Sequence, residues 1–257
     1  KAKAPNVRQS MAAGVTAVAG QVLRLNGRPL AGVSLSMGDR RVKTDANGEF
    51  MLTDVPSGPE DLVIDGSSAN HGKHHYGRFE YGMAVKAGKV NALPFVIWMT
   101  PLDTRHVITI PSPTTREIDV RNPAIPGLEL KIPAGTVIRD DVGNIVTQLT
   151  MTAIPVDQPP FPLPPVPVPV YFTIQPGGAH LEGISAASAK GAQLIYPNFN
   201  HGQPGGRVDF WNYDPAGKGW YVYGKGPVSA DGTQIVPDPG IVIYEFTGAM
   251  VGGETLE

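Results

Sequence analysis

The sequence predicts an all-β protein that consists of two antiparallel β-sandwich domains. Three observations lead to this fold class. First, 31 glycines and 26 prolines among 257 residues interrupt the chain too often for long helices, because a proline inside a helix costs about 3 kcal/mol and a glycine about 1 kcal/mol relative to alanine. Second, 41% hydrophobic residues and a net charge of −2 do not fit a disordered chain. Third, turn residues recur at short intervals between alternating stretches, which is typical of short strands.

The first domain is expected over residues 15–102. A strand over residues 18–23 is followed by the tight turn Asn26-Gly27 and by a second strand over residues 29–37. Turn residues then separate further short strands, which are expected at residues 41–44, 49–52, 61–64 and 93–99. Short strands that are separated by turn residues at these intervals predict a small antiparallel sandwich.

Four motifs in this domain resemble the carboxypeptidase regulatory-like, or transthyretin-like, β-sandwich family. In chain order they are Gly20-Gln21-Val22, Gly27-Arg28-Pro29-Leu30-Ala31-Gly32-Val33, Thr44-Asp45-Ala46-Asn47-Gly48-Glu49-Phe50 and Val55-Pro56-Ser57-Gly58. The resemblance implies a non-catalytic accessory fold of bacterial surface and secreted proteins. The residues themselves agree with it, since Asp45 can cap a turn, Gly48 can supply a positive φ, and Phe50 is placed to enter the core.

A second domain is expected over residues 118–246, and residues 103–117 are expected to be a linker. Residues 127–137 and 146–152 alternate on either side of a turn at 140–143. The run Ile132-Pro133-Ala134-Gly135-Thr136-Val137 resembles the recognisable core of the ZU5-type β-sandwich. Further motifs downstream strengthen the resemblance, namely Val170–Ala179, Tyr196-Pro197-Asn198, Pro204-Gly205 and Val228–Gly240.

Taken in order, the two resemblances are similar to a segment of very large bacterial proteins that carry YD/RHS repeats. That resemblance implies a structural or interaction module, which docks on or caps a neighbouring domain of a secreted or cell-surface protein. Its partners would be other domains of the same polypeptide or another protein. Because the chain starts at Lys1 and has no initiating Met, we expect a fragment whose export signal lies outside it.

Composition and missing motifs exclude several classes of function. Lys and Arg total 21 against 23 for Asp and Glu, so nucleic acid is not an expected partner. No apolar run approaches the ~20 residues of a membrane span, and 0 Cys excludes thiolate chemistry. Nucleophile-elbow, zinc-protease, phosphate-loop and dinucleotide motifs are absent from the sequence. We therefore expect no enzyme activity and no cofactor; the least favoured alternative is an enzyme whose paired carboxylates come from distant strands and leave no local motif.

The only histidine cluster is His71, His74 and His75. Neutral imidazoles can bind zinc or nickel, which makes these residues a weak metal candidate. Lys73 interrupts the run and no carboxylate lies within it, so a solvated loop without metal is the favoured interpretation.

Residues 155–169 contain 8 prolines in 15 positions. Such a run favours polyproline II and can be a ligand for aromatic grooves. It lies between two strands of the second predicted sandwich, which favours a stiff surface connection over a docking motif.

Five aromatic residues gather near the end of the second domain: Trp211, Tyr213, Trp220, Tyr221 and Tyr223. A turn at 214–217 predicts a hairpin that places the two aromatic strands side by side. Aromatic rings on a strand surface can form a platform for sugars, which would make the protein an adhesin that binds a cell-surface glycan. The favoured interpretation is cross-strand packing and core.

Overall fold

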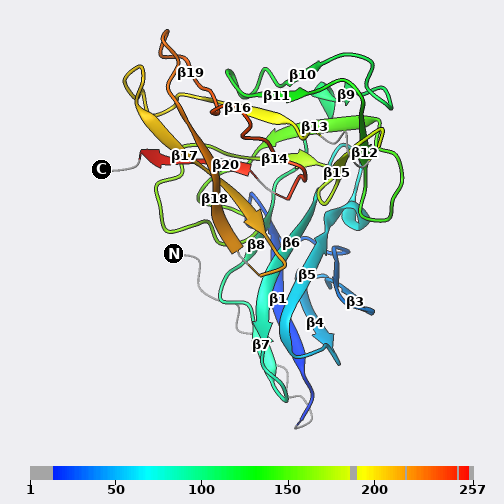
Figure 1. Ribbon diagram of the computed structural model, residues 1–257. Coiled ribbons are helices and arrows are strands. Elements are labelled where there is room, and N and C mark those ends of the chain that lie inside the picture. Colours follow the sequence, from blue (N-terminus) through cyan, green and yellow to red (C-terminus); the bar gives the residue numbers. More distant parts are fainter. Residues whose placement is uncertain (1–13, 186–189, 218, 248, 255–257) are drawn as a thin grey trace. The chain divides into compact units, whose positions relative to one another are not determined.

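The computed structural model describes residues 14–185, 190–217, 219–247 and 249–254 (Figure 1). Among these residues the only helices are two short 3-10 turns, η1 Gly66–Ala69 and η2 Thr104–His106. All other regular structure is β-strand, so the predicted all-β fold class is confirmed, with β-sandwich character. Among the described residues, no helix has the length and apolar character that a membrane span requires.

The chain forms two compact units. Of the described residues, unit 1 contains those up to Leu102 together with Asp157–Leu163 and Asp214–Gly219, and unit 2 contains the others. The predicted domains were continuous stretches of sequence, and the structure differs because two segments from the second half of the chain belong to unit 1.

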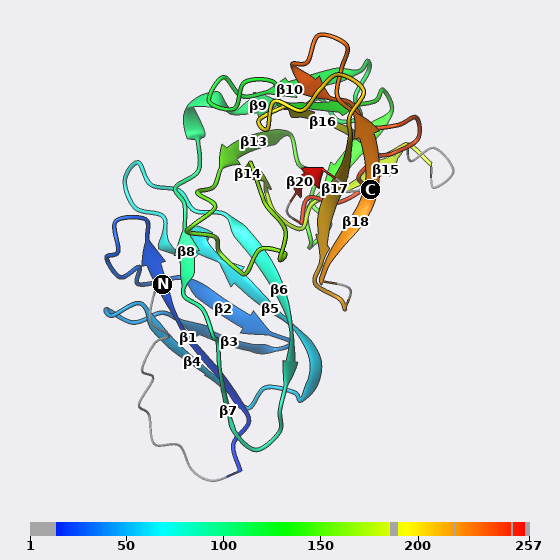
Figure 2. The same ribbon diagram turned by 90° about the vertical axis from the view of Figure 1, so that its left-hand side faces the viewer.

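Unit 1 has eight described strands in two sheets. Figure 2 labels these strands, β1 to β8, and β1 is blue. They are β1 Ala17–Arg24, β2 Ser34–Met37, β3 Arg40–Lys43, β4 Glu49–Thr53, β5 Gly58–Asp65, β6 Arg78–Val85, β7 Val90–Ala92 and β8 Ile97–Met99. One sheet has the order β4-β1-β7, with β8 also paired to β1, and the other has the order β3-β2-β5-β6. β7 and β8 run parallel to β1. Unit 1 was predicted to be purely antiparallel, and this part of the prediction is wrong.

The turn between β3 and β4 follows the sequence prediction. The Asp45 carboxylate accepts hydrogen bonds from the N–H groups of Asn47 at 2.8 Å and Glu49 at 2.9 Å. Gly48 has a φ of 70°, and a Cβ at this position would lie 2.3 Å from the carbonyl oxygen of Val22. Phe50 is buried at 4% exposure. The turn therefore needs glycine both for its backbone angle and for its close approach to β1.

Two of the longer predicted strands are interrupted in the structure. Only β2 forms within residues 29–37, and residues 127–137 divide into two strands. Gly32 has a φ of 84° and Gly135 a φ of 80°. Strand residues have negative φ, so each glycine ends the regular structure that alternation alone would extend.

Part of the proline tract is buried in unit 1 and is not a surface connection. The Pro159 carbonyl accepts from the N–H of Trp98 at 3.4 Å, and Gln158 Nε2 donates to the Leu25 carbonyl at 3.0 Å. Phe161 is 0% exposed, and its ring centroid lies 6.2 Å from that of Tyr81. Proline has no N–H to leave unsatisfied, so a proline-rich segment is easier to bury than other irregular backbone.

Unit 2 has twelve described strands. They are β9 Ile108–Thr109, β10 Ile118–Arg121, β11 Glu129–Ile132, β12 Thr136–Arg139, β13 Gln148–Ala153, β14 Tyr171–Gln175, β15 His180–Gly183, β16 Gln193–Pro197, β17 Arg207–Asp214, β18 Gly219–Pro227, β19 Gln234–Ile235 and β20 Ala249–Glu254. The sheet orders are β10-β11-β16-β19, β12-β15 and β18-β17-β20-β14-β13-β9. Buried apolar side chains such as Leu130, Phe172 and Phe210 form the core of this unit.

Residues 103–117 lie in unit 2 and contain η2 and β9, so the predicted linker is structured. β9 pairs with β13, and the N–H of Asp103 donates to Thr152 Oγ1 at 2.9 Å. The prolines that suggested a linker instead separate short elements, because each proline prevents a ladder hydrogen bond at its own position.

Candidate functional site

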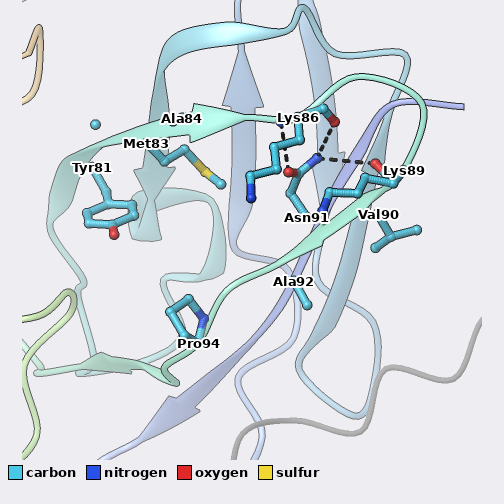
Figure 3. Close-up of a pocket in the computed structure, with 10 residues that line it drawn as sticks. Tyr81, Met83, Ala84, Lys86, Lys89, Val90, Asn91, Ala92 and Pro94 are labelled. Carbon is cyan, nitrogen blue, oxygen red and sulfur yellow. Dashed lines mark hydrogen bonds between the residues drawn. The ribbon is translucent and has the colours of Figure 1, made fainter.

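A hollow in unit 1 lies beside β6 and β7, and we call it the β6–β7 groove (Figure 3). Its lining consists of residues 81–84, Lys86, Lys89, residues 90–92 and Pro94, and its volume is about 460 Å³. That volume falls within the range of ligand-binding pockets. Tyr81 and Pro94 lie at one end of the groove, and the lysines lie at the other, beside the turn that joins the two strands.

The Asn91 side chain closes the turn end of the groove. Its Oδ1 accepts from the N–H of Lys86 at 2.9 Å. Its Nδ2 lies 3.0 Å from the Lys86 carbonyl, 3.2 Å from the Lys89 carbonyl and 3.1 Å from the Ala17 carbonyl. A side-chain amide therefore makes the contacts that a backbone ladder would make in an ordinary hairpin.

β6 and β7 leave the turn as edge strands of different sheets. Among the described strands β6 pairs only with β5, and β7 only with β1. The Lys89 carbonyl accepts from β1 at 3.1 Å, and the Leu93 N–H donates to β1 at 2.8 Å. In a parallel ladder the residues that bond to one neighbour alternate, so the backbone groups of Val90 and Ala92 point away from β1.

The groove has a positive charge at its turn end. Lys86 and Lys89 are exposed, and neither ammonium group is in an ion pair with any residue that the structure describes. The groove lining contains no carboxylate. An anionic group at this end would meet two cations without displacing an existing partner.

A group of carboxylates lies near the middle of β6. Asp61 on β5 is the register partner of Gly82. Burial raises the pKa of Asp61, and the negative charges of Glu80, Asp214 and Glu60 raise it further. The charge beside the β6 strand therefore changes from negative near Gly82 to positive at the turn.

The three candidate histidines lie on a tight turn after η1. The N–H of His71 donates to the His74 carbonyl at 3.0 Å, and the N–H of His74 donates to the His71 carbonyl at 2.9 Å. His75 Nδ1 lies 3.3 Å from the Asn70 side-chain amide. Within the described parts of the chain, no three His, Asp or Glu side chains are grouped so that they could hold a metal ion. The loop thus has local hydrogen bonds in place of a ligand set.

The five candidate aromatics lie on β17 and β18, which are neighbours in one sheet. Successive side chains of a strand point to opposite faces, so the chain separates them into two groups. Trp211 and Tyr213 share a face with Trp220, because the Tyr213 and Trp220 ring centroids are 5.1 Å apart. Tyr221 and Tyr223 belong to the other face. The hairpin therefore does not present five rings on one surface.

Ring contacts in the core occupy several of these aromatics. Tyr223 lies 5.9 Å from Phe210, between ring centroids, and its hydroxyl group is hydrogen-bonded to that of Tyr196. Burial raises the pKa of Tyr223 well above its usual value. On the opposite face, Tyr213 is 5% exposed and Trp220 contacts Tyr171 at 6.4 Å. Trp211 and Tyr221 are half-buried, and sugar binding by this hairpin stays a prediction.

The sequence reasoning missed an Asp–His pair at the start of unit 2. His106 Nδ1 lies 2.7 Å from Asp103 Oδ2, which also accepts from Asn122 Nδ2 at 3.0 Å. Burial would raise the pKa of Asp103, but the hydrogen bonds from His106, Asn122 and the Arg105 N–H outweigh it and lower the pKa. Asp103 is also the N-cap of η2. The signal in the sequence was the spacing Asp-x-x-His, which fits a capped turn as well as a catalytic pair.

The groove residues were also missed as a site. Residues 86–91 were predicted only as a turn before a buried strand. Glycine, alanine, lysine and asparagine in a turn carry no signal for a binding site, because the hollow depends on which sheet each flanking strand joins.

Comparisons with known proteins give little further information. No family model matches the chain, and no curated protein sequence matches it. Among solved structures, the Bacillus anthracis TIE protein is similar over 95% of this chain at 15% identity with a TM-score of 0.29. The chain spans 49% of the length of that protein. A TM-score of this size does not identify a common fold.

Proposed function

We propose that this chain is a non-catalytic interaction module of a larger exported bacterial protein, in which it docks on or caps a neighbouring domain. The two predicted family resemblances, transthyretin-like and then ZU5-like, are part of this proposal, as is the context of an RHS-repeat protein. The partner would be another domain of the same polypeptide or a separate protein.

One observation carries the proposal, namely the open β6–β7 groove. Both of its flanking strands end a sheet, and an unpaired sheet edge is a template for association with another chain. Monomeric proteins commonly cover such edges or place charges on them. Here Val90 and Ala92 have no strand partner among the described residues on the side away from β1, and they line a hollow of about 460 Å³.

The absence of an enzyme activity is also proposed, and the polar contacts support it. Asp103 holds His106 and Asn122 together in a capped turn. Asp140 accepts from the N–H groups of Val142 at 3.1 Å and Asn144 at 2.8 Å. These carboxylates satisfy local backbone and side-chain donors, which is a structural role.

The test is a binding titration of the 257-residue chain with each protein segment that the parent gene encodes next to it. We expect saturable binding to at least one segment, with slower hydrogen exchange of unit 1 amides in the complex. Binding to none of them would refute the proposal. A glycan array run with the same preparation tests the adhesin alternative, since a glycan whose binding is lost in Trp220→Ala would replace the docking function.

A further inference from the structure

We propose that the β6–β7 groove binds an extended acidic peptide segment, which adds as a β-strand to the free edge of β7 and places its carboxylates beside Lys86 and Lys89. This inference rests on the proposed docking function and names the chemistry of the partner.

The backbone of β7 supplies the recognition. Val90 and Ala92 direct their N–H and C=O groups away from β1, and no described strand pairs with them. An added strand would satisfy up to four of these groups. Binding of an extended peptide at a sheet edge gives affinity through the main chain and leaves specificity to the side chains beside it.

The side chains along the groove leave room for a backbone to approach. Ala84 and Ala92 are small, and both are exposed. Met83 and Tyr81 provide apolar surface on the wall opposite β7 (Figure 3). The hollow therefore has a polar edge on one side and a largely apolar wall on the other, as a strand-binding groove requires.

The charges select an acidic segment and its placement. Lys86 and Lys89 have no ion pair with a described residue and no carboxylate beside them in the lining. Farther along β6, Pro215 approaches Gly82 so closely that a Cβ there would lie 2.1 Å from its carbonyl oxygen. The tip that carries Pro215 also brings Asp214 toward Asp61. A peptide carboxylate is thus favoured at the turn end and repelled at the Gly82 end.

The turn is held in place before any peptide binds. Asn91 makes four contacts with backbone groups around the turn. The Gly88 N–H donates to Thr16 Oγ1 at 2.9 Å, which ties the turn to the chain just before β1. A site that is already ordered loses less conformational entropy on binding.

The edge strand β3 is a natural comparison within unit 1. It carries exposed Arg40, Arg41 and Lys43, so its charge is at least as positive as that of the groove. None of its residues lines the β6–β7 groove. If charge alone attracted an acidic peptide, β3 would bind it equally well, and this makes β3 variants the matched control.

The experiment is an NMR titration of the 257-residue chain with an acetylated eight-residue peptide of alternating valine and glutamate. The control peptide has glutamine in place of each glutamate. We expect the acidic peptide to shift and protect the Val90 and Ala92 amides. Lys86→Gln combined with Lys89→Gln should weaken binding about fivefold to tenfold at low salt. Arg41→Gln combined with Lys43→Gln should leave the affinity unchanged.

Ala92→Pro tests the strand pairing separately, since it removes one outward N–H and leaves the lysines in place. We expect it to weaken binding at least as much as the lysine variant, with an unchanged melting temperature as evidence of folding. If it fails to fold, protection of the Val90 and Ala92 amides in the native chain decides the question.

Three results would overturn the inference: no binding at millimolar peptide, equal weakening by the β3 variant, or binding without protection at Val90 and Ala92. The proposed docking function fails separately. If an adjoining segment of the parent protein binds with the same affinity to the Lys86/Lys89 variant, docking stands and the acidic-peptide site is wrong.

Discussion

The two hairpins β6–β7 and β17–β18 join their strands in opposite ways. β17 and β18 are neighbours in one sheet, and their aromatic side chains Phe210 and Trp220 pack against Tyr196 of β16 and Tyr171 of β14. β6 and β7 leave their turn for different sheets, and Asn91 makes the contacts that a ladder would have made. The hairpin rich in aromatics is thus largely packed, whereas the hairpin with small and charged residues borders a hollow.

This difference shows that residue type is a poor guide to an open surface in this chain. Aromatic rings are conspicuous in a sequence, but they bury large areas and tend to be drawn into a core. Small residues give no signal for a binding site in a sequence, yet they leave space where two sheet edges diverge. Four predictions test the contrast, beginning with the largest expected effect.

Phe210→Ala should destabilise unit 2 by about 3–5 kcal/mol. Phe210 is 0% exposed, and its ring centroid lies 4.8 Å from that of Tyr196. Denaturant unfolding followed by the fluorescence of Trp211 and Trp220 measures the loss. Lys89→Ala in the groove is the control, and it should change stability by less than about 0.5 kcal/mol. Equal effects of the two variants would remove the contrast between the hairpins.

Asn91→Ala should cost unit 1 about 1.5 kcal/mol, because it removes the side chain that pairs with both the N–H and the carbonyl of Lys86. Thermal melting and amide exchange of the turn measure the effect. The matched control is Asn26→Ala, since Asn26 accepts only one hydrogen bond in the described structure, from the Arg28 N–H at 3.1 Å. A loss no larger than that of the control would show that Asn91 does not organise the turn.

Tyr223→Phe should cost about 1 kcal/mol, because it deprives the buried Tyr196 hydroxyl of its hydrogen bond. Tyr171→Phe is a close control, since the Tyr171 hydroxyl is buried and has no hydrogen-bond partner among the described residues. We expect this second variant to be neutral or stabilising in the same urea titration. A larger loss for Tyr171→Phe would contradict the assigned hydrogen bond.

Asp61→Asn should stabilise unit 1 at pH 7 by a few tenths of a kcal/mol, since solvent screens much of the repulsion. Burial and then the neighbouring carboxylates raise the pKa of Asp61 in the folded state. Native stability therefore falls as the pH rises through that raised pKa, and the gain from Asn disappears once Asp61 is protonated at low pH. Melting temperatures of the native chain and of Asp61→Asn between pH 3 and pH 8 measure this stability difference, with Asp39→Asn as the exposed control. A gain that persists at acid pH would show that charge is not the cause.

Local features were predictable from the sequence where one turn supplies all the contacts. Asp45 and Gly48 take their predicted turn roles because the capping hydrogen bonds and the positive φ involve only residues within the turn. The hairpin between the aromatic strands is present for the same reason. The proline tract was predicted as a surface connection, and the structure buries Phe161 in unit 1. Its contacts are with residues far away in the chain, which periodicity does not identify.

The candidate site shows the same limit more strongly. The turn at residues 86–91 was predicted, but the groove beside it was not. Its existence depends on β7 pairing with β1 and on β6 pairing with β5, both of which are contacts between distant parts of the chain. The Asp103–His106 contact is local, and the spacing could have revealed it.

The sequence by itself determined that this protein is all-β, because glycine and proline exclude long helices and alternation favours strands. It also determined individual turns, where a positive φ or a capping carboxylate is a property of one or two residues. Only the tertiary structure decided which strands share a sheet, which aromatics enter a core and which edges stay open. Those outcomes depend on non-local pairing, since a strand has two edges and two faces and its own residues do not specify which neighbour covers each one.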